Sequence, residues 1–355
     1  MTVIELFALQ QSQTQPQKND DLPWNDLGFH GGDLYWAAER FGRPVDQWID
    51  LSTGVNPNSY PIPDVKAADY QRLPYLSPEF LASIEGYYGQ PGIPVSGSQQ
   101  AIDLLPGMLK KLPVLLPEVG YKGYEKIFRQ ADFYCQHYPS LDKASAMIAI
   151  MDAITLNPNQ HVVIINPNNP TGLIFTPEEL LEFAKLLAPD AMLIVDEAFM
   201  DVTPEGSMLN DRLLLNVLVF RSFGKFFGLA GLRLGVVFTS NTALINRLDS
   251  TLDPWRINGL AQAVATKAYS DNTWQSAARE QLATQKTKHQ AKLLTLVNQT
   301  QGRLLVRQGL FSAIIMPASM AQHAWQALAL KGILTRQVPV SSEKTILRIG
   351  IGGDF

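Results

Sequence analysis

The chain has 355 residues, 46% of them hydrophobic, which is enough to bury a large core in one big domain or two. Its net charge of −4 at pH 7 and pI near 5.8 provide no basic field for nucleic acid. No apolar run is long enough to cross a membrane, and no secretory signal is expected. The single Cys135 excludes an internal disulfide and a cysteine-only metal site, and no metal is expected. These features favour a cytoplasmic protein.

The sequence of the first part of the chain predicts an N-terminal arm, followed by alternating strands and helices. Residues 1–21 are rich in Gln and weakly patterned, which indicates a mobile arm. Further along, short and fully apolar runs are typical of strands that are buried on both faces. These runs begin at Val114, Val162, Met192, Val217 and Leu234. Between two of them a helix should begin at Thr176, with Pro177 at its first position and Glu179 completing a capping box.

The pattern changes after about Asp253. One long helical stretch is predicted through residues 259–300, and two short strands at 311–316 and 345–350 should bracket a helix near 321–330. The chain therefore predicts an α/β fold, with a mostly parallel sheet in a large domain and a smaller α+β domain. The expected divisions are an N-terminal arm with a segment that joins the small domain, a large domain and a small C-terminal domain, at residues 1–60, 61–252 and 253–355.

Lys225 lies just past an apolar strand, in a turn that begins at Ser222 and continues through a glycine-spaced loop to Arg233. A lysine in this position is ordinarily a solvated surface group. Here apolar and small neighbours would partly desolvate the ammonium and lower its pKa, as a Schiff-base lysine requires. Ser222 and Arg233 add a hydroxyl and a guanidinium fork, which are groups that hold a phosphate. The combination predicts that Lys225 binds pyridoxal 5'-phosphate (PLP) as an imine.

Two further residues follow apolar runs and could bind the same cofactor. Asp196 closes its run, and although such an aspartate is often a helix cap or salt-bridge partner, it could instead pair with a protonated pyridine nitrogen. Glu197 should point to the opposite side of the strand. Asn169 lies in a turn rich in Pro and Gly, and it could hydrogen-bond the ring hydroxyl beside a cis Asn169–Pro170 bond.

A helix start and an aromatic residue complete the predicted cofactor site. Small residues open a helical pattern that runs to Leu109, although Pro106 could kink or shorten it. Open backbone N–H groups and the helix dipole favour an anion at such a start, although most helix starts bind nothing. The predicted phosphate ligands there are Gly97, Ser98 and Gln99. Tyr121, more often a core or surface aromatic, could stack on the pyridine face.

These residues, in this order, resemble the fold-type I PLP enzymes of the aspartate aminotransferase superfamily, over residues 30–353. Within that superfamily the chain looks most like the L-threonine-O-3-phosphate decarboxylases of cobalamin biosynthesis. The segments that carry this narrower resemblance are residues 30–34, 50–57, 221–233 and 253–258. Histidinol-phosphate aminotransferases are similar as well, and they share the motif at residues 166–172.

The resemblance implies how a substrate would bind. Arg348 matches the family's carboxylate-binding arginine, and Arg336 is a second anion ligand. The other expected substrate-binding residues are His30, Gly31, Gly32 and Asn56, of which His30 and the two glycines would take a phosphate.

Two departures from the aminotransferase pattern stand out. Phe199 replaces a tyrosine that bonds the ring hydroxyl in aminotransferases. Leu73 replaces a tyrosine that reaches the partner subunit's cofactor, a contact that Tyr75 could supply instead.

The activity implied by the resemblance is PLP-dependent decarboxylation of L-threonine O-3-phosphate to (R)-1-amino-2-propanol O-phosphate, by a homodimer. The alternative is an aminotransferase for a phosphorylated substrate such as histidinol phosphate. A third reading is a binding or regulatory protein that has kept the fold, but the intact Lys225, Asp196 and Arg233 argue against it.

Overall fold

The computed structural model describes residues 31–352, so the predicted N-terminal arm and His30 lie outside the described residues. Contacts divide the chain into two units, one formed by Val55–Gln281 and the other by Met1–Gly54 with Leu282–Phe355. The sequence placed the divisions at 60/61 and 252/253 instead. The second division lies later in the chain because α11 (Gly259–Ser270) packs against α4 (Pro78–Tyr88).

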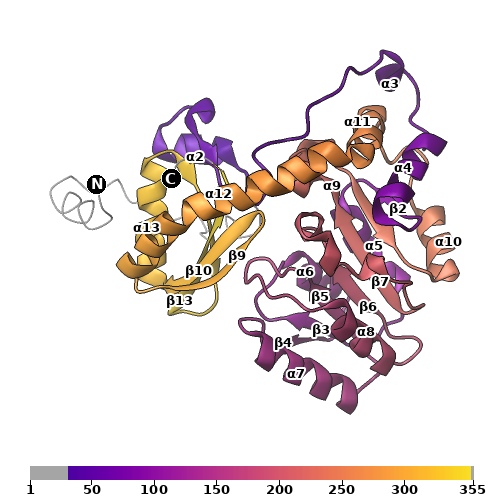
Figure 1. The fold of residues 1–355 in the computed structure, drawn as a ribbon. Coiled ribbons are helices and arrows are strands. Elements are labelled where there is room, and N and C mark those ends of the chain that lie inside the picture. Colours follow the sequence, from indigo (N-terminus) through magenta and orange to yellow (C-terminus); the bar gives the residue numbers. More distant parts are fainter. Residues whose placement is uncertain (1–30, 353–355) are drawn as a thin grey trace. The chain divides into compact units, whose positions relative to one another are not determined.

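The larger unit is built on a seven-stranded sheet, within the described residues, in the order β2-β8-β7-β6-β5-β3-β4 (Figure 1). Its strands are β2 (Ile93–Val95), β3 (Val114–Pro117), β4 (Cys135–Tyr138), β5 (His161–Ile165), β6 (Leu193–Asp196), β7 (Val217–Ser222) and β8 (Gly235–Phe238). The neighbours from β4 to β7 pair in parallel, whereas β8 is antiparallel to both β7 and β2. The five predicted strands and the mostly parallel sheet are confirmed.

Helices precede, connect and follow these strands. They are α3 (Ala68–Gln71), α4, α5 (Ser98–Met108), α6 (Gly123–Gln130), α7 (Lys143–Leu156), α8 (Pro177–Leu186), α9 (Phe223–Phe226), α10 (Thr242–Thr251) and α11, with 3-10 turns η2 (Met200–Val202), η3 (Pro204–Gly206), η4 (Met208–Asn210) and η5 (Ala230–Leu232). The predicted capping box is confirmed at α8, where Thr176 and Glu179 bond each other's backbone. Pro106 lies inside α5 and does not end it. β6 ends at Asp196, and the carboxyl end of β7 leads directly into α9, which carries Lys225.

The smaller unit contains a four-stranded antiparallel sheet, within the part of the chain described, in the order β12-β13-β10-β9. Its elements are α2 (Leu34–Phe41), η1 (Val45–Gln47), β1 (Ile49–Asp50), β9 (Arg303–Gln308), β10 (Phe311–Pro317), α13 (Ala318–Leu330), β11 (Ile333–Leu334), β12 (Arg336–Pro339) and β13 (Lys344–Gly350). The strand β1 pairs in parallel with β11. The predicted strand–helix–strand order from β10 through α13 to β13 is confirmed, and with it the α/β fold that has a smaller α+β part.

The prediction of one long helix over residues 259–300 is wrong. The structure has two helices there, α11 and α12 (Asn272–Gln299), and α12 runs on from the larger unit into the smaller one. The break falls at Asp271, whose side chain accepts a hydrogen bond from the backbone N–H of Trp274 at 2.9 Å. An aspartate that binds a backbone N–H three residues later favours a new helix start. Among the described residues, no helix is long and apolar enough to cross a membrane.

Candidate functional site

Asp196 is a buried carboxylate at the end of β6, where it is 5% exposed. The hydroxyl of Tyr124 donates a hydrogen bond to its Oδ2 at 3.0 Å, and the backbone N–H of Ala198 donates to its Oδ1 at 3.0 Å. Burial raises the pKa of Asp196, while the two hydrogen bonds and the charge of Lys225 oppose this rise. Since each carboxylate oxygen has further lone pairs, Asp196 can also pair with a cation.

Lys225 lies half-buried in α9, which continues directly from β7. Its backbone is fixed by Asn56, whose N–H donates to the carbonyl of Lys225 at 2.9 Å and whose Nδ2 donates to the carbonyl of Phe226 at 2.9 Å. The Nζ of Lys225 lies 5.5 Å from the centre of the Phe199 ring. The side chain of Asn56 is thus bonded to the backbone beside the lysine, and its predicted role in binding substrate stays a prediction.

Gly97, Ser222 and Arg233 lie at the start of α5, at the end of β7 and just before β8. Gly97 precedes α5 with φ 76° and ψ 152°, and a Cβ there would lie 2.8 Å from a guanidinium nitrogen of Arg233. Arg233 is itself left-handed, with φ 54°, and exposed. Ser222 precedes α9 but makes no capping hydrogen bond with its side chain. A Cβ at Gly235, the β8 partner of Ser222, would lie 2.5 Å from the backbone nitrogen of Ser98. The predicted phosphate ligands therefore converge from separate segments.

Tyr121 contacts the same helix start. Its hydroxyl donates a hydrogen bond to Oε1 of Gln99 at 2.5 Å, and the Nε2 of Gln99 donates to Asp103 at 2.6 Å. The ring lies over Gly123, where a Cβ would come within 2.3 Å of it. A residue larger than glycine at position 123 would displace the ring. The structure thus brings together Tyr121 and Gln99, both of which the sequence placed at the cofactor.

The turn at residues 166–172 is held by its own asparagines. The side chain of Asn166 exchanges hydrogen bonds with the backbone of Phe175, at 3.0 and 2.9 Å. The Nδ2 of Asn168 donates to the carbonyl of Val119 at 2.8 Å, which links the turn to the segment before Tyr121. Asn169 is half-buried, and the predicted cis bond to Pro170 is confirmed, together with a second one at Asn166–Pro167.

In the smaller unit, Arg336 and Arg348 form a cross-strand pair on β12 and β13. Arg348 is 1% exposed, donates to the carbonyl of Ser52, and lies 5.6 Å from the centre of the Phe311 ring. Burial and the charge of Arg336 lower the pKa of Arg348 to about 9, so the group is still cationic at neutral pH. Two opposed guanidinium groups repel each other, and a bound anion would relieve this repulsion.

The glycines predicted to bind phosphate lie beside the same serine. The backbone N–H of Gly32 donates to Oγ of Ser52 at 2.8 Å, and a Cβ at Gly31 would lie 2.2 Å from the carbonyl oxygen of Ser52. Ser52 in turn donates through Oγ to Asp50 at 2.6 Å. The prediction for His30 lies outside the described residues.

Comparison with known proteins decides the family. The family model for aminotransferase class I and II matches residues 63–354. The chain belongs to this family. The threonine-phosphate decarboxylase of Pseudomonas aeruginosa is 35% identical to this family member over 337 residues, which cover 92% of this chain and 93% of that protein.

Two other relatives carry different names. The histidinol-phosphate aminotransferase 1 of Psychrobacter arcticus is 32% identical over 213 residues, which cover 58% of this chain and 54% of that protein. The crystal structure of histidinol-phosphate aminotransferase from Sinorhizobium meliloti in complex with pyridoxal-5'-phosphate superposes with a TM-score of 0.73 at 17% identity, covering 97% of this chain and 95% of that chain. This second likeness shows the fold, and the predicted fold class is confirmed.

Sequence reasoning missed two features of this aminotransferase-family site. The first is Tyr124, whose hydroxyl donates a hydrogen bond to Asp196. It lies three residues after Tyr121, and this short spacing was the available signal. The second feature is the contact between Glu197 and Arg221, each of which adjoins a predicted cofactor residue. The opposite signs of their charges at two strand ends were the available signal.

Proposed function

We propose that this protein decarboxylates L-threonine O-3-phosphate to (R)-1-amino-2-propanol O-phosphate with PLP as its cofactor. The observation that carries the proposal is the constellation in the larger unit, where a buried Asp196 and Lys225 lie at neighbouring strand ends. The 35% identity to a threonine-phosphate decarboxylase over 92% of the chain supports the choice of reaction. A place in cobalamin biosynthesis is part of the same proposal.

The residues present fit PLP. The pyridine nitrogen needs a carboxylate, and Asp196 is buried, held by two donors and still able to accept another. The phosphate needs convergent donors. The hydroxyl of Ser222, which makes no capping hydrogen bond, and the guanidinium of Arg233 beside Gly97 provide them. We assign the remaining contacts to Ser98, Gln99, Tyr121 and Asn169.

PLP, when bound, supplies an electron-accepting ring that stabilises negative charge developing at the substrate Cα. Asp196 would hold the ring nitrogen in its protonated form because the buried carboxylate favours a neighbouring cation. Lys225 would supply the amine that holds the cofactor. After carbon dioxide has left, its Nζ would deliver a proton to Cα.

The substrate carries a carboxylate and a phosphate, and we propose that two arginines bind these groups. Arg348 would take the carboxylate through its planar fork, and Arg336 would act as a second anion ligand. His30, Gly31 and Gly32 would contact the phosphate. Holding both anionic ends fixes which bond to Cα is aligned for cleavage, so orientation would select loss of carbon dioxide over loss of a proton.

Amino transfer to or from a phosphorylated substrate is the second candidate. It is supported by the 32% identity to a histidinol-phosphate aminotransferase, which extends over only 58% of the chain. Phe199 speaks against it, since its ring faces Lys225 and offers no hydroxyl to the cofactor. The decarboxylase reading fits better.

A Lys225→Ala variant tests the proposal. The purified wild-type protein with PLP should show a visible cofactor band and release carbon dioxide from L-threonine O-3-phosphate, and the variant should lose both. Lys111→Ala, at an exposed lysine between α5 and β3, is the matched control and should keep both. An unchanged visible spectrum in Lys225→Ala would contradict the assignment.

A homodimer and a cytoplasmic location complete the proposal. The dimer is expected from the family resemblance, and Tyr75, which is 66% exposed, would then be available to reach a partner's cofactor. Light scattering of the purified protein measures its mass in solution, and a mass of one chain at micromolar concentration would contradict the dimer.

A further inference from the structure

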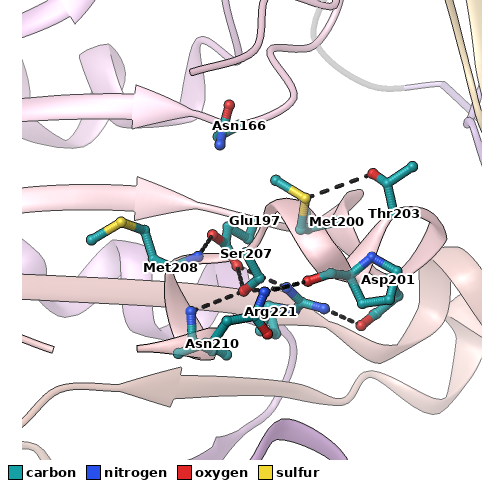
Figure 2. A network of polar contacts seen from close by, with 12 residues as sticks. Asn166, Glu197, Met200, Asp201, Thr203, Ser207, Met208, Asn210 and Arg221 are labelled. Carbon is teal, nitrogen blue, oxygen red and sulfur yellow. Dashed lines mark hydrogen bonds and ion pairs between the residues drawn. The ribbon is translucent and has the colours of Figure 1, made fainter. Parts of the chain in front are cut away.

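Two charged residues lie directly beside the cofactor residues and are paired inside the larger unit (Figure 2). Glu197 follows Asp196, and Arg221 precedes Ser222. The side chains of Glu197 and Arg221 are 0% and 2% exposed, and Nη1 of Arg221 lies 2.7 Å from Oε2 of Glu197. Because successive side chains of a strand point to opposite faces, Asp196 and Glu197 serve different faces of the same sheet. The pair therefore lies on the opposite face from the carboxylate of Asp196.

The carboxylate of Glu197 has fixed partners in addition to Arg221. The hydroxyl of Ser207 donates to its Oε2 at 2.6 Å, and the backbone N–H of Met208 donates to its Oε1 at 2.8 Å. Its own N–H donates to the carbonyl of Phe220 at 2.8 Å. The backbone of Glu197 is thus bonded to β7, and its carboxylate is bonded to the loop that precedes β7. These contacts leave the carboxylate little freedom to rotate.

The other end of Arg221 is held as firmly. Its Nη2 contacts Oδ1 of Asp201, and its guanidinium carbon lies 4.9 Å from the centre of the Tyr88 ring. The cluster contains two carboxylates and one guanidinium, so its formal charge is negative when both acids are ionised. Other ionisable groups around Asp201 or Arg221 come from α4, α11 and α12, namely Tyr87, Tyr269 and Arg279.

A buried ion pair seldom adds stability over an apolar pair of the same size, because desolvation offsets the attraction between the charges. Breaking one leaves a buried charge without its partner, so the pair specifies one geometry strongly. In this chain that geometry is the position of the end of β6 relative to the end of β7. The end of β6 carries Asp196, and the end of β7 carries Ser222 and leads to Lys225.

We infer that Glu197 and Arg221 are a positioning pair for the cofactor site, fixing Asp196 relative to the Ser222–Lys225 segment and setting the charge beneath Asp196. The inference rests on the proposed PLP-dependent function. Glu197 also acts on Asp196 through space, since its negative charge raises the pKa of that carboxyl. Neither residue needs to touch substrate for this role.

The test is Glu197→Gln in the holoenzyme, a change that keeps size and removes one charge. Loss of a buried negative charge disfavours the protonated, cationic form of a nearby group. The pH midpoint of the cofactor's visible absorbance should therefore fall by about half a unit or more. The value of kcat should fall about tenfold while KM changes by less than about threefold, because geometry rather than substrate affinity is altered.

Asp201→Asn is the matched control, since it removes an equal charge from the other nitrogen, Nη2, of the same guanidinium, and Asp201 does not adjoin Asp196 in the sequence. It should lower the melting temperature about as much as Glu197→Gln, with less than about half the shift in absorbance midpoint. Equal midpoint shifts in the two variants, or none in either, would overturn the inference. If the wild-type protein has no cofactor band at all, the proposed function fails instead.

Ser207→Ala serves if Glu197→Gln does not fold, because it removes one hydrogen bond from Glu197 and keeps every charge. We expect kcat to fall about threefold with KM unchanged, since loosening the carboxylate loosens the strand end. Unchanged kcat and absorbance midpoint in this variant would count against the positioning role.

Discussion

Replacing Gly97 by alanine is expected to weaken binding of the cofactor phosphate. Gly97 has φ 76° and ψ 152°, and holding alanine in that region costs about 1–3 kcal/mol. Its new Cβ would lie 2.8 Å from a guanidinium nitrogen of Arg233, so the guanidinium must move away. A hydrogen bond to a charged group contributes about 1.5–3 kcal/mol, so losing one should raise the Kd for PLP about 10–100-fold.

Fluorescence titration of the apo-enzyme with PLP measures this Kd directly. Gly107→Ala is the control, because Gly107 lies in the same helix and an added Cβ meets nothing within 4 Å. That variant should bind PLP as the wild type does and gain about 0.5–1 kcal/mol of stability from better helix propensity. A Kd for Gly97→Ala within about twofold of wild type would refute the phosphate assignment at this helix start.

Three further changes test other contacts. Tyr124→Phe removes the donor to Asp196 and should cost about 1.5–3 kcal/mol, seen as a roughly tenfold or greater loss of kcat and a shifted cofactor absorbance. Arg348→Lys keeps the charge but loses the planar fork, so KM for L-threonine O-3-phosphate should rise by about 30-fold, and an unchanged KM would exclude Arg348 from substrate binding. Burial lowers the pKa of His161, so the unfolded chain binds its proton more readily. The free energy of unfolding should therefore fall as pH drops below about 6.5, and urea denaturation should show a weaker pH dependence in His161→Gln.

The strands of the larger sheet could be predicted because their residues are apolar on both faces. Runs such as His161–Ile165 and Leu193–Asp196 are buried at every position and therefore lack polar alternation. The strand β9 is different, since Arg303–Gln308 begins and ends with polar residues at the edge of its sheet. Its pairing with β10 is local, since only Gly309 and Leu310 separate the two strands, but the polar residues of β9 hid this strand from a search for apolar runs.

The candidate residues at strand ends could be located in the sequence, but their neighbours in space could not. Asp196 stands out as an acid after an apolar run, whereas Tyr124 reaches it from a helix 72 positions earlier. The pairing of Arg336 with Arg348 depends on the antiparallel register of two strands, which a single sequence does not specify. The division of residues 259–300 into two helices was readable, since Asp271 could have been recognised as a helix start.

The most direct test is a paired assay of the purified protein with PLP. One arm measures carbon dioxide released from L-threonine O-3-phosphate, and the other measures amino transfer from histidinol phosphate to 2-oxoglutarate. We expect steady release of carbon dioxide that depends on Lys225, with little amino transfer. Robust amino transfer without release of carbon dioxide would contradict the proposed decarboxylase and identify an aminotransferase instead.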